Sequence, residues 1–357
     1  MESETHIAVQ IPNGDIMIDL TTKTEDLYIN IRNRSDMPTQ IFIGPRGTGK
    51  TFSALRPEIN NQYTGDKFIY LRNDQREARI ATSEIGNAFK KINTTYGVDV
   101  SGDFNTQLGM GRFLMNDGED TIGYAFGLTT FAGARSIDLS DVSHGIFEEF
   151  IPEKHVQKRR NRGEAYLNFV ETVGRNREVE GEKPFTMYLL ANAIQLDDDI
   201  LLALKVTNDI QDMISHGEKR RTLRDRGIYI ELVDVAVTEK KKSTSLYKIG
   251  NEQFNNDALK ADFANARLNL IQKNFNQREY TPMMSYDSIC IYKSKRENVY
   301  HIAETGEKAK NHLLLTEHLR LRSLFRTTYC RELGADRITF DNFETRNKIE
   351  VALKVQS

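Results

Sequence analysis

The chain has 357 residues, of which 49 are lysine or arginine and 51 are aspartate or glutamate, giving a formal net charge of -2. A chain of this length has room for two or three domains, because domains usually contain about 100 to 200 residues. The nearly balanced charge excludes a protein that is basic over its whole surface, so any contact with nucleic acid must come from local basic patches.

The start of the chain contains early acids and no long apolar run. This pattern predicts neither a signal peptide nor a transmembrane helix, so we expect a soluble intracellular protein. The two cysteines, Cys290 and Cys330, have no CxxC spacing and no neighbouring His/Cys cluster. We therefore expect both to be packing residues, with no disulfide framework and no zinc site.

Short apolar stretches alternate with longer polar or helix-compatible segments over the first two thirds of the chain. The stretches lie at 41–43, 68–71, 124–128, 145–147 and 187–191, and a further strand candidate at 227–237 precedes the charged run TEKKKSTS. This alternation predicts an α/β domain built on a parallel sheet.

The pattern changes after about residue 240. Residues 246–280 are polar with a helical pattern, residues 285–304 predict a β-hairpin that turns at 295–298, and residues 313–333 predict an amphipathic helix with arginines on its polar side. We therefore expect a large α/β domain at 1–240, a linker at 241–280 and a small α+β domain at 281–357.

The stretch IFIGPRGTGKTFSAL, residues 41–55, is an apolar strand followed by a glycine-rich loop and the start of a helix. It fits the P-loop pattern G-x-x-x-x-G-K-[ST] in the strand-to-helix context that this motif requires. In this pattern backbone N–H groups surround the β-phosphate, the lysine reaches the β- and γ-phosphates, and the hydroxyl ligates Mg²⁺. The predicted nucleotide-binding residues are Gly44, Pro45, Arg46, Gly47, Thr48, Gly49, Lys50 and Thr51. Pro57 should kink or end the following helix early.

Two acids end the apolar stretch VSHGIFEEF at 142–150. Hydrolysis of a nucleoside triphosphate needs one acid near the metal and one that orients the attacking water, best placed at the end of a strand beside the P-loop strand. We predict that Glu148 and Thr51 ligate the metal and that Glu149 orients the water. The alternative is an acidic strand end at the surface.

Asn192 follows the apolar stretch at 187–191, where a polar side chain can sense the γ-phosphate or the attacking water. The alternative is a loop asparagine with local hydrogen bonds. The chain has no Asn-Lys-x-Asp motif for reading guanine, so we expect ATP.

Arg135 in GARS (133–136) and Arg175 in ETVGRNRE (171–178) flank the acidic pair in sequence. The alternative for each is a solvated surface arginine. An ATPase that works as a ring needs a basic group from the neighbouring subunit to neutralise charge in the transition state, and these two arginines are the best candidates.

Together these motifs resemble the phi29-type bacteriophage genome-packaging ATPases. The resemblance runs from about residue 38 to the C-terminus and rests on GPRGTGKT, FGLTTFAGARSIDLSDVSHGIFEEF, ETVGRNRE with the later LLANA, and the tail RITFDNFETRNKIEVAL. It implies a P-loop ATPase domain of the RecA-like (ASCE) class at 1–240, with helices on both faces of its sheet. It also implies a helical connector and a ribonuclease H-like domain at 281–357 that has lost its metal-binding acids.

The resemblance assigns roles to single positions. Lys50 and Thr51 match the phosphate and metal residues of the family, and Glu148 and Glu149 match its Walker B acid and catalytic glutamate, although the family usually has Asp where Glu148 stands.

Arg175 matches the trans-acting arginine finger, and Arg135 matches a second trans-acting basic residue. The segment LRNDQREAR, residues 71–79, matches a loop that faces DNA in the pore of the ring, which makes Arg76 and Arg79 candidates for DNA binding. In the C-terminal domain Asp287 and Asp341 are isolated, so we expect no nuclease activity, which needs several convergent carboxylates.

The resemblance implies an ATP-hydrolysing motor that uses Mg²⁺ and translocates double-stranded DNA into an empty procapsid. The motor would be a homo-oligomeric ring, a pentamer by family resemblance, attached transiently to the portal in the host cell cytoplasm. Whether a structural RNA joins it to the portal stays open. The alternatives are a small-molecule P-loop kinase, another DNA-stimulated P-loop ATPase, and a nucleotide-binding structural protein without turnover.

Overall fold

The computed structural model describes residues 8–10, 16–18, 29–32, 34–134, 137–152, 161–175, 177–192, 196, 198–233, 270–272 and 275–355. The chain divides into two compact units, Met1–Ile194 with Met213–Phe263 and Gln195–Asp212 with Ala264–Ser357. Most of the predicted linker at 241–280 lies in 234–269, outside the described residues, so the domain boundaries at 240 and 280 stay predictions.

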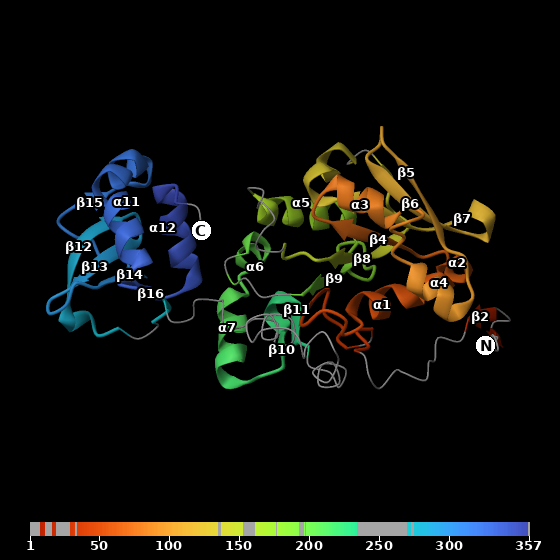
Figure 1. Cartoon of the computed structure of the whole chain (residues 1–357), viewed down its shortest axis with the longest axis horizontal. Coiled ribbons are helices and arrows are strands. Elements are labelled where there is room, and N and C mark those ends of the chain that lie inside the picture. The colour runs from red at the N-terminus through yellow and green to blue at the C-terminus, as the bar shows by residue number, and fades with distance from the viewer. Residues whose placement is uncertain are drawn as a thin grey trace, which may run out of the picture. The chain divides into compact units, whose positions relative to one another are not determined.

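The first unit is built on a nine-stranded sheet (Figure 1). In spatial order its strands are β10 (Arg220–Leu223), β11 (Ile228–Leu232), β3 (Thr39–Ile43), β9 (Thr186–Ala191), β8 (Val142–Glu148), β4 (Lys67–Arg72), β7 (Asp120–Gly127), β6 (Met110–Met115) and β5 (Ser101–Asn105). The six strands from β11 to β7 are parallel, and β10, β6 and β5 are antiparallel to their neighbours.

Both faces of the parallel strands are covered. On one face Phe42, Tyr70 and Ile146 belong to a core that also contains residues of α1, α3 and α4. On the other face Phe147 packs beside Tyr166 of α5. Strands buried on both faces are nearly continuous apolar runs, which is why the short apolar stretches identified the parallel strands. The predicted α/β fold class with helices on both faces is confirmed.

Most helices between residues 50 and 226 have ten residues or fewer, and the segment 195–212 among them belongs to the second unit. The helices in this range are α1 (Lys50–Leu55), η2 (Arg56–Asn60), α2 (Asn61–Thr64), α3 (Gln75–Ala81), α4 (Lys90–Tyr96), η3 (Asn116–Gly118), η4 (Leu128–Ala134), α5 (Arg162–Gly174), α6 (Asp199–Ala203), α7 (Thr207–His216) and η5 (Arg224–Arg226), where η marks a 3-10 helix. A separate two-stranded antiparallel sheet pairs β1 (Ala8–Gln10) with β2 (Ile16–Ile18). As Pro57 predicts, α1 ends at Leu55 and a 3-10 turn follows.

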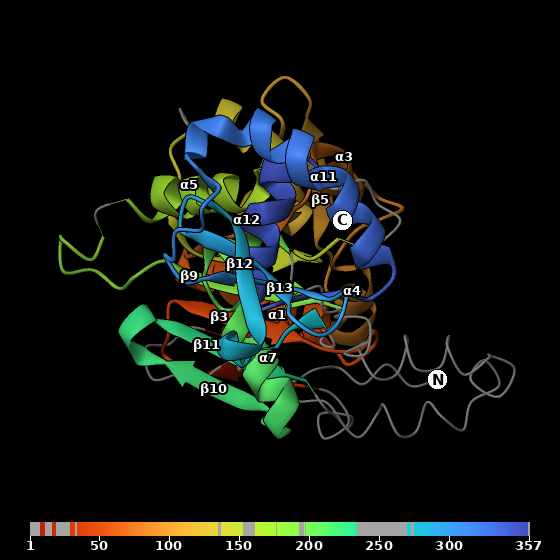
Figure 2. The same ribbon diagram turned by 90° about the vertical axis from the view of Figure 1, so that its left-hand side faces the viewer.

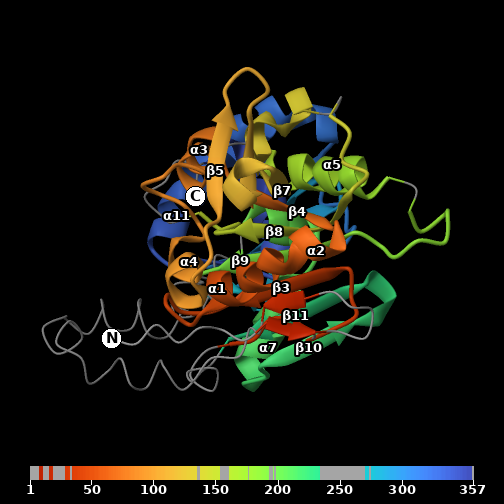
Figure 3. The ribbon, with the colours of Figure 1, turned by 90° about the vertical axis from the view of Figure 1, so that its right-hand side faces the viewer.

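The antiparallel hairpin of β5 and β6 at the sheet edge was not predicted from the sequence. Figure 3 shows β5 beside α3. Gly102 and Gly111 allow this approach, because a side chain on either would meet Thr82 at less than 3 Å, at 2.5 and 2.7 Å respectively. The hairpin therefore depends on close backbone packing that hydrophobic periodicity does not reveal.

The second unit contains a five-stranded sheet (Figure 2). In spatial order its strands are β15 (His312–Leu313), β12 (Tyr280–Tyr286), β13 (Ile289–Ser294), β14 (Tyr300–Glu304) and β16 (Ile338–Phe340), and its helices are η8 (Gln277–Glu279), η9 (Leu315–Glu317), α11 (His318–Gly334) and α12 (Phe343–Leu353). The predicted hairpin is β13 and β14, and the predicted amphipathic helix is α11. Leu321, Phe325 and Tyr329, spaced four residues apart, bury one face of α11.

The two cysteines differ. Both are free thiols, and Cys290 is buried in the second unit. Cys330 is exposed on α11, so the prediction that it is a packing residue is wrong. Cys330 and the next residue, Arg331, are both exposed, so Cys330 lies outside the buried stripe of α11. Within the described part of the chain, no helix has the length and apolar character needed to cross a membrane.

Candidate active site

The carboxyl ends of β3, β9, β8 and β4 meet at one edge of the sheet, because these four strands are parallel neighbours. The residues that directly follow these strands are Gly44, Asn192, Glu149 and Asn73. In open α/β sheets this edge is where ligands bind. The topology therefore brings together the P-loop and both polar strand ends predicted from the sequence.

The P-loop turns the chain from β3 into α1. Gly47 and Gly49 have φ angles of 72° and 88°, in the left-handed region that favours glycine. Lys50 is 4% exposed, and its Nζ donates hydrogen bonds to the carbonyl oxygens of Gly44 at 2.8 Å and Pro45 at 2.9 Å. The lysine ammonium therefore lies against the loop that the motif assigns to phosphate.

The two predicted metal ligands are in contact. Thr51 Oγ1 donates a 2.6 Å hydrogen bond to Glu148 Oε1, and Tyr70 donates to Oε2 at 3.4 Å. Burial raises the pKa of Glu148, against the opposing effects of the Thr51 hydrogen bond and of Arg72. A half-buried carboxylate beside a hydroxyl suits Mg²⁺, which binds through few protein oxygens together with phosphates and water.

Among the described residues no group of three or more His, Cys, Asp or Glu side chains is arranged to hold a metal ion. A site of one carboxylate and one hydroxyl does not need such a group, because Mg²⁺ in nucleotide sites takes most of its ligands from phosphates and water. The donor set of Thr51 and Glu148 therefore fits the predicted cofactor.

Glu149 directly follows β8 and has a φ of 50°, in the left-handed region where non-glycine residues are uncommon. Both of its carboxylate oxygens are held. Arg72 Nη2 donates to Oε2 at 2.9 Å, and Asn192 Nδ2 donates to Oε1 at 3.0 Å. Arg46 of the P-loop forms a longer ion pair with Oε1 at 4.0 Å. The structure thus brings three of the predicted site residues together, and it adds Arg72.

Arg72 and Asn73 are the site residues that the sequence analysis missed. The signal was their position at the end of β4, at the same sheet edge as the acids. Asn73 Nδ2 donates to the carbonyl oxygen of Glu149 at 2.6 Å, and Arg162 Nη2 donates to Asn73 Oδ1 at 2.7 Å. Asn73 therefore connects the backbone of Glu149 to Arg162, a buried residue of α5.

Arg76 and Arg79 lie on helix α3, so their predicted place on a loop is wrong. Asp74 caps this helix, because its Oδ1 accepts a 3.0 Å hydrogen bond from the backbone N–H of Glu77. Both arginines are exposed and three residues apart, which puts them on the same side of the helix. The role of both arginines in DNA binding stays a prediction.

One of the two arginines predicted to act in trans, Arg175, has its ion pair outside this cluster. Arg175 follows α5 with an exposed side chain, and its ion pair is to Asp138 at 3.8 Å. Such a solvent-exposed pair contributes little to stability. Arg135 lies outside the described residues. The roles of both arginines stay predictions.

Residues 27–334 match the family described as Podovirus DNA encapsidation protein (Gp16). The chain belongs to this family. The predicted resemblance is thus confirmed, and the chain is a viral DNA-packaging protein.

Solved structures are similar over nearly the whole length of this family member. The packaging motor of bacteriophage phi29 has 20% identity and a TM-score of 0.60, over 89% of this chain and 95% of that chain. The Phi-28 gp11 DNA packaging motor has 19% identity and a TM-score of 0.59, over 90% of this chain and 96% of that chain. At these identities the two likenesses show the fold. No curated protein matches the chain.

Proposed function

We propose that this encapsidation protein is the ATP-hydrolysing subunit of a motor that moves double-stranded DNA into a viral procapsid. The observation that carries the proposal is the sheet edge where the P-loop, Glu148, Glu149 and Asn192 lie together. Residues 44–51 bind the phosphates of ATP, with Lys50 at the β- and γ-phosphates.

Thr51 and Glu148 would hold Mg²⁺, which when bound neutralises charge on the phosphates. Glu149 orients the attacking water as the general base. Arg72 and Asn192 each hold one of its carboxylate oxygens, and this fixes the direction of the free lone pairs. Preorganisation of this kind avoids the cost of arranging the base during the reaction.

The active complex in this proposal is a homo-oligomeric ring, with five subunits by family resemblance. Arg175 enters the site of the neighbouring subunit as an arginine finger, and Arg135 supplies a second basic group. The exposed side chain of Arg175, paired only weakly with Asp138, is available for such a role. A group supplied from a neighbour lets one subunit control hydrolysis in the next.

DNA contact in this proposal is made by Arg76 and Arg79 on α3. These contacts are to phosphates, because a packaging motor must accept every sequence of the genome. The partners of the ring are double-stranded DNA and the portal of the procapsid, in the cytoplasm of the host cell. A structural RNA as a further partner is left open.

The second unit, in our proposal, does not cut DNA. Asp341 uses its carboxylate to accept hydrogen bonds from the backbone N–H groups of Glu304 at 3.0 Å and Asn342 at 2.8 Å. Asp287 lies in the turn between β12 and β13 with a φ of 51°. Neither arrangement supplies the convergent carboxylates that a two-metal nuclease needs. Nicking of plasmid DNA, lost on substitution of Asp287 or Asp341, would overturn this part.

ATP hydrolysis by the full chain, measured with and without double-stranded DNA and empty procapsids, tests the proposal. We expect stimulation by both. Lys50→Ala should abolish nucleotide binding, whereas Glu149→Gln should bind ATP and not turn it over. Glu180→Gln, at an exposed position, is the matched control. Near-normal turnover in Glu149→Gln would show that the base is elsewhere.

A further inference from the structure

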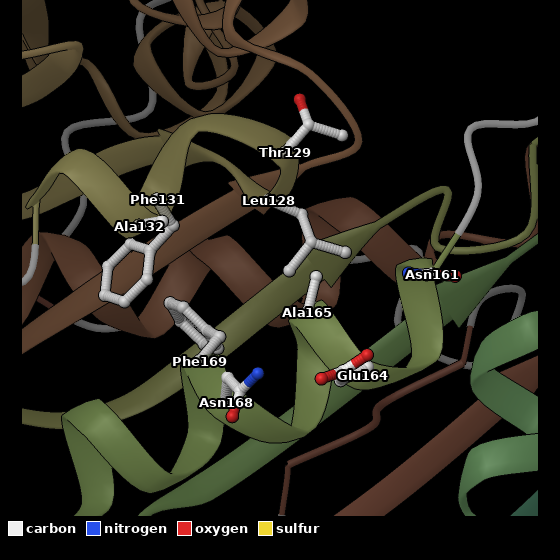
Figure 4. Close-up of a pocket in the computed structure, with 9 residues that line it drawn as sticks. All are labelled: Leu128, Thr129, Phe131, Ala132, Asn161, Glu164, Ala165, Asn168 and Phe169. Atoms are coloured by element: carbon white, nitrogen blue, oxygen red, sulfur yellow. The ribbon is translucent and has the colours of Figure 1, made fainter.

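A pocket of about 220 Å³ lies between η4 and α5 (Figure 4). Its lining residues are Leu128, Thr129, Phe131, Ala132, Asn161, Glu164, Ala165, Asn168 and Phe169. In the apolar part, the rings of Phe131 and Phe169 pack edge to face with their centroids 4.6 Å apart. The pocket is separate from the cluster around Glu149 and shares no residue with it.

The polar part of the pocket comes from Asn161, Glu164 and Asn168 of α5 and its cap. Within the part of the chain that the structure describes, these three side chains make no hydrogen bond or ion pair. Glu164 is exposed, so its carboxylate is accessible. An acid in the first turn stabilises a helix, but that effect needs neither the amides nor an apolar pocket beside it.

We infer that this pocket is a docking site for a lysine or arginine side chain of a second copy of this chain. The carboxylate of Glu164 and the amide oxygens of the two asparagines accept hydrogen bonds from a cation. The walls of Leu128 and the two phenylalanines suit the apolar stem of the same side chain. The volume fits one long side chain, and the carboxylate repels phosphate groups of DNA.

The choice of a second copy rests on the proposed ring. The two walls of the pocket are the segments that lead to the proposed trans-acting residues, since η4 ends at Ala134 just before Arg135 and α5 ends just before Arg175. In a ring, neighbouring subunits join through two different surfaces. An acidic pocket on one subunit and a basic side chain on the next form such a pair.

Both walls of the pocket are also hydrogen-bonded to Asn73. The backbone N–H of Thr129 donates to the carbonyl oxygen of Asn73 at 3.4 Å, and Arg162 of α5 donates to its side chain. Asn73 in turn holds the carbonyl oxygen of Glu149 at 2.6 Å. Docking of a neighbour in the pocket therefore acts on elements that position the proposed catalytic base.

The test is the association constant of the full chain, measured by sedimentation velocity with double-stranded DNA and a non-hydrolysable ATP analogue. Glu164→Lys should weaken association by about tenfold or more, the scale of removing one partner of an interface ion pair, and Glu164→Gln by less. Glu171→Lys, two turns along α5 and outside the pocket, should leave the association constant unchanged. Ala165→Leu keeps the charge, fills the pocket and should also weaken association.

Association of Glu164→Lys equal to that of Glu171→Lys would overturn the inference. Weakening by Glu164→Lys but not by Ala165→Leu would also overturn it, because the cation would then bind the carboxylate from outside the pocket. A wild-type chain that stays monomeric in all these conditions overturns it as well. The proposed ATPase is judged separately, by loss of ATP hydrolysis in Glu149→Gln, so the two failures can be told apart.

Discussion

Arg72 Nη2 donates a 2.9 Å hydrogen bond to Oε2 of Glu149 and so joins the ends of the neighbouring strands β4 and β8. The same guanidinium forms an ion pair with Glu77 of α3 at 3.3 Å. Burial lowers the pKa of Arg72, but the interactions with the neighbouring Tyr70 and with the carboxylates of Glu77 and Glu149 outweigh burial and raise the pKa above its ordinary value. The proposed catalytic base is therefore held by a permanent cation.

Arg72→Lys should lower kcat for ATP hydrolysis by about 10- to 100-fold, because a lysine cannot hold Glu149 and Glu77 with one planar fork. KM for ATP should change little, since the carboxylates that Arg72 holds belong to Glu149 and Glu77, outside the P-loop. Steady-state kinetics measure both constants. The control is Arg112→Lys on β6, where Arg112 forms an exposed ion pair with Asp103 of β5. An unchanged kcat in Arg72→Lys would contradict a positioning role.

Replacing Arg76 and Arg79 together by glutamine should weaken DNA binding and reduce DNA stimulation of ATP hydrolysis, with basal hydrolysis retained. If both arginines contact phosphates, the slope of log K against log salt should become less steep by about 2. Binding to duplex DNA at several salt concentrations measures this slope. The control is Arg112→Gln. A slope equal to that of the wild type would remove α3 from the DNA-binding surface.

Stability of the second unit should fall in acid because of His301. This side chain is fully buried, and its Nδ1 pairs with Thr339 Oγ1 at 2.9 Å. Burial lowers the pKa of His301 from 6.5 to about 4. Between these values the unfolded chain binds a proton that the folded chain does not. The free energy of unfolding should therefore drop as pH falls through this window, by about 1.4 kcal/mol per pH unit and roughly 3 kcal/mol in all.

His301→Gln should remove this part of the acid sensitivity. Hydrogen exchange of second-unit peptides in urea, between pH 7 and pH 4, measures the free energy of unfolding for wild type and variant. The half-buried His318, changed to glutamine, is the control in the same unit. Parallel pH dependence in wild type and His301→Gln would show that His301 does not titrate as its burial predicts.

Arg175→Ala should bind ATP but hydrolyse it about a thousandfold more slowly, the usual scale for an arginine finger. Mixing Arg175→Ala with Glu149→Gln should restore activity, because an interface can then combine an intact Arg175 with an intact Glu149. Hydrolysis of the mixture is compared with that of each variant alone. If mixed oligomers form and no activity returns, Arg175 acts within its own chain, and Arg135 becomes the better candidate.

The sequence was sufficient to locate the parallel strands and to place the P-loop, Glu148, Glu149 and Asn192 at the ends of these strands. Parallel strands are buried on both faces, so each is an apolar run, and the residue after each run falls at the same edge of the sheet. The contacts of Glu148 with Thr51 and of Glu149 with Asn192 follow from this topology.

Other features depend on information that periodicity does not carry. The β5–β6 hairpin is half-exposed and relies on glycines packed against Thr82. Helix α3 is only seven residues long, too short for a clear apolar periodicity, and its start is marked only locally, by the Asp74 cap. The contact of Arg72 with Glu149 joins residues 77 positions apart, and it needs the order of the strands to be known.

Packaging of DNA into procapsids is the activity that the proposed motor must perform. Wild-type protein, procapsids, double-stranded DNA and ATP are incubated together, and the DNA that becomes resistant to nuclease is measured. We expect protected DNA with wild type and ATP, and none with Glu149→Gln, although this variant binds ATP. Protection by Glu149→Gln at the wild-type level, or by wild type without ATP, would contradict the claim that ATP hydrolysis at this site drives packaging.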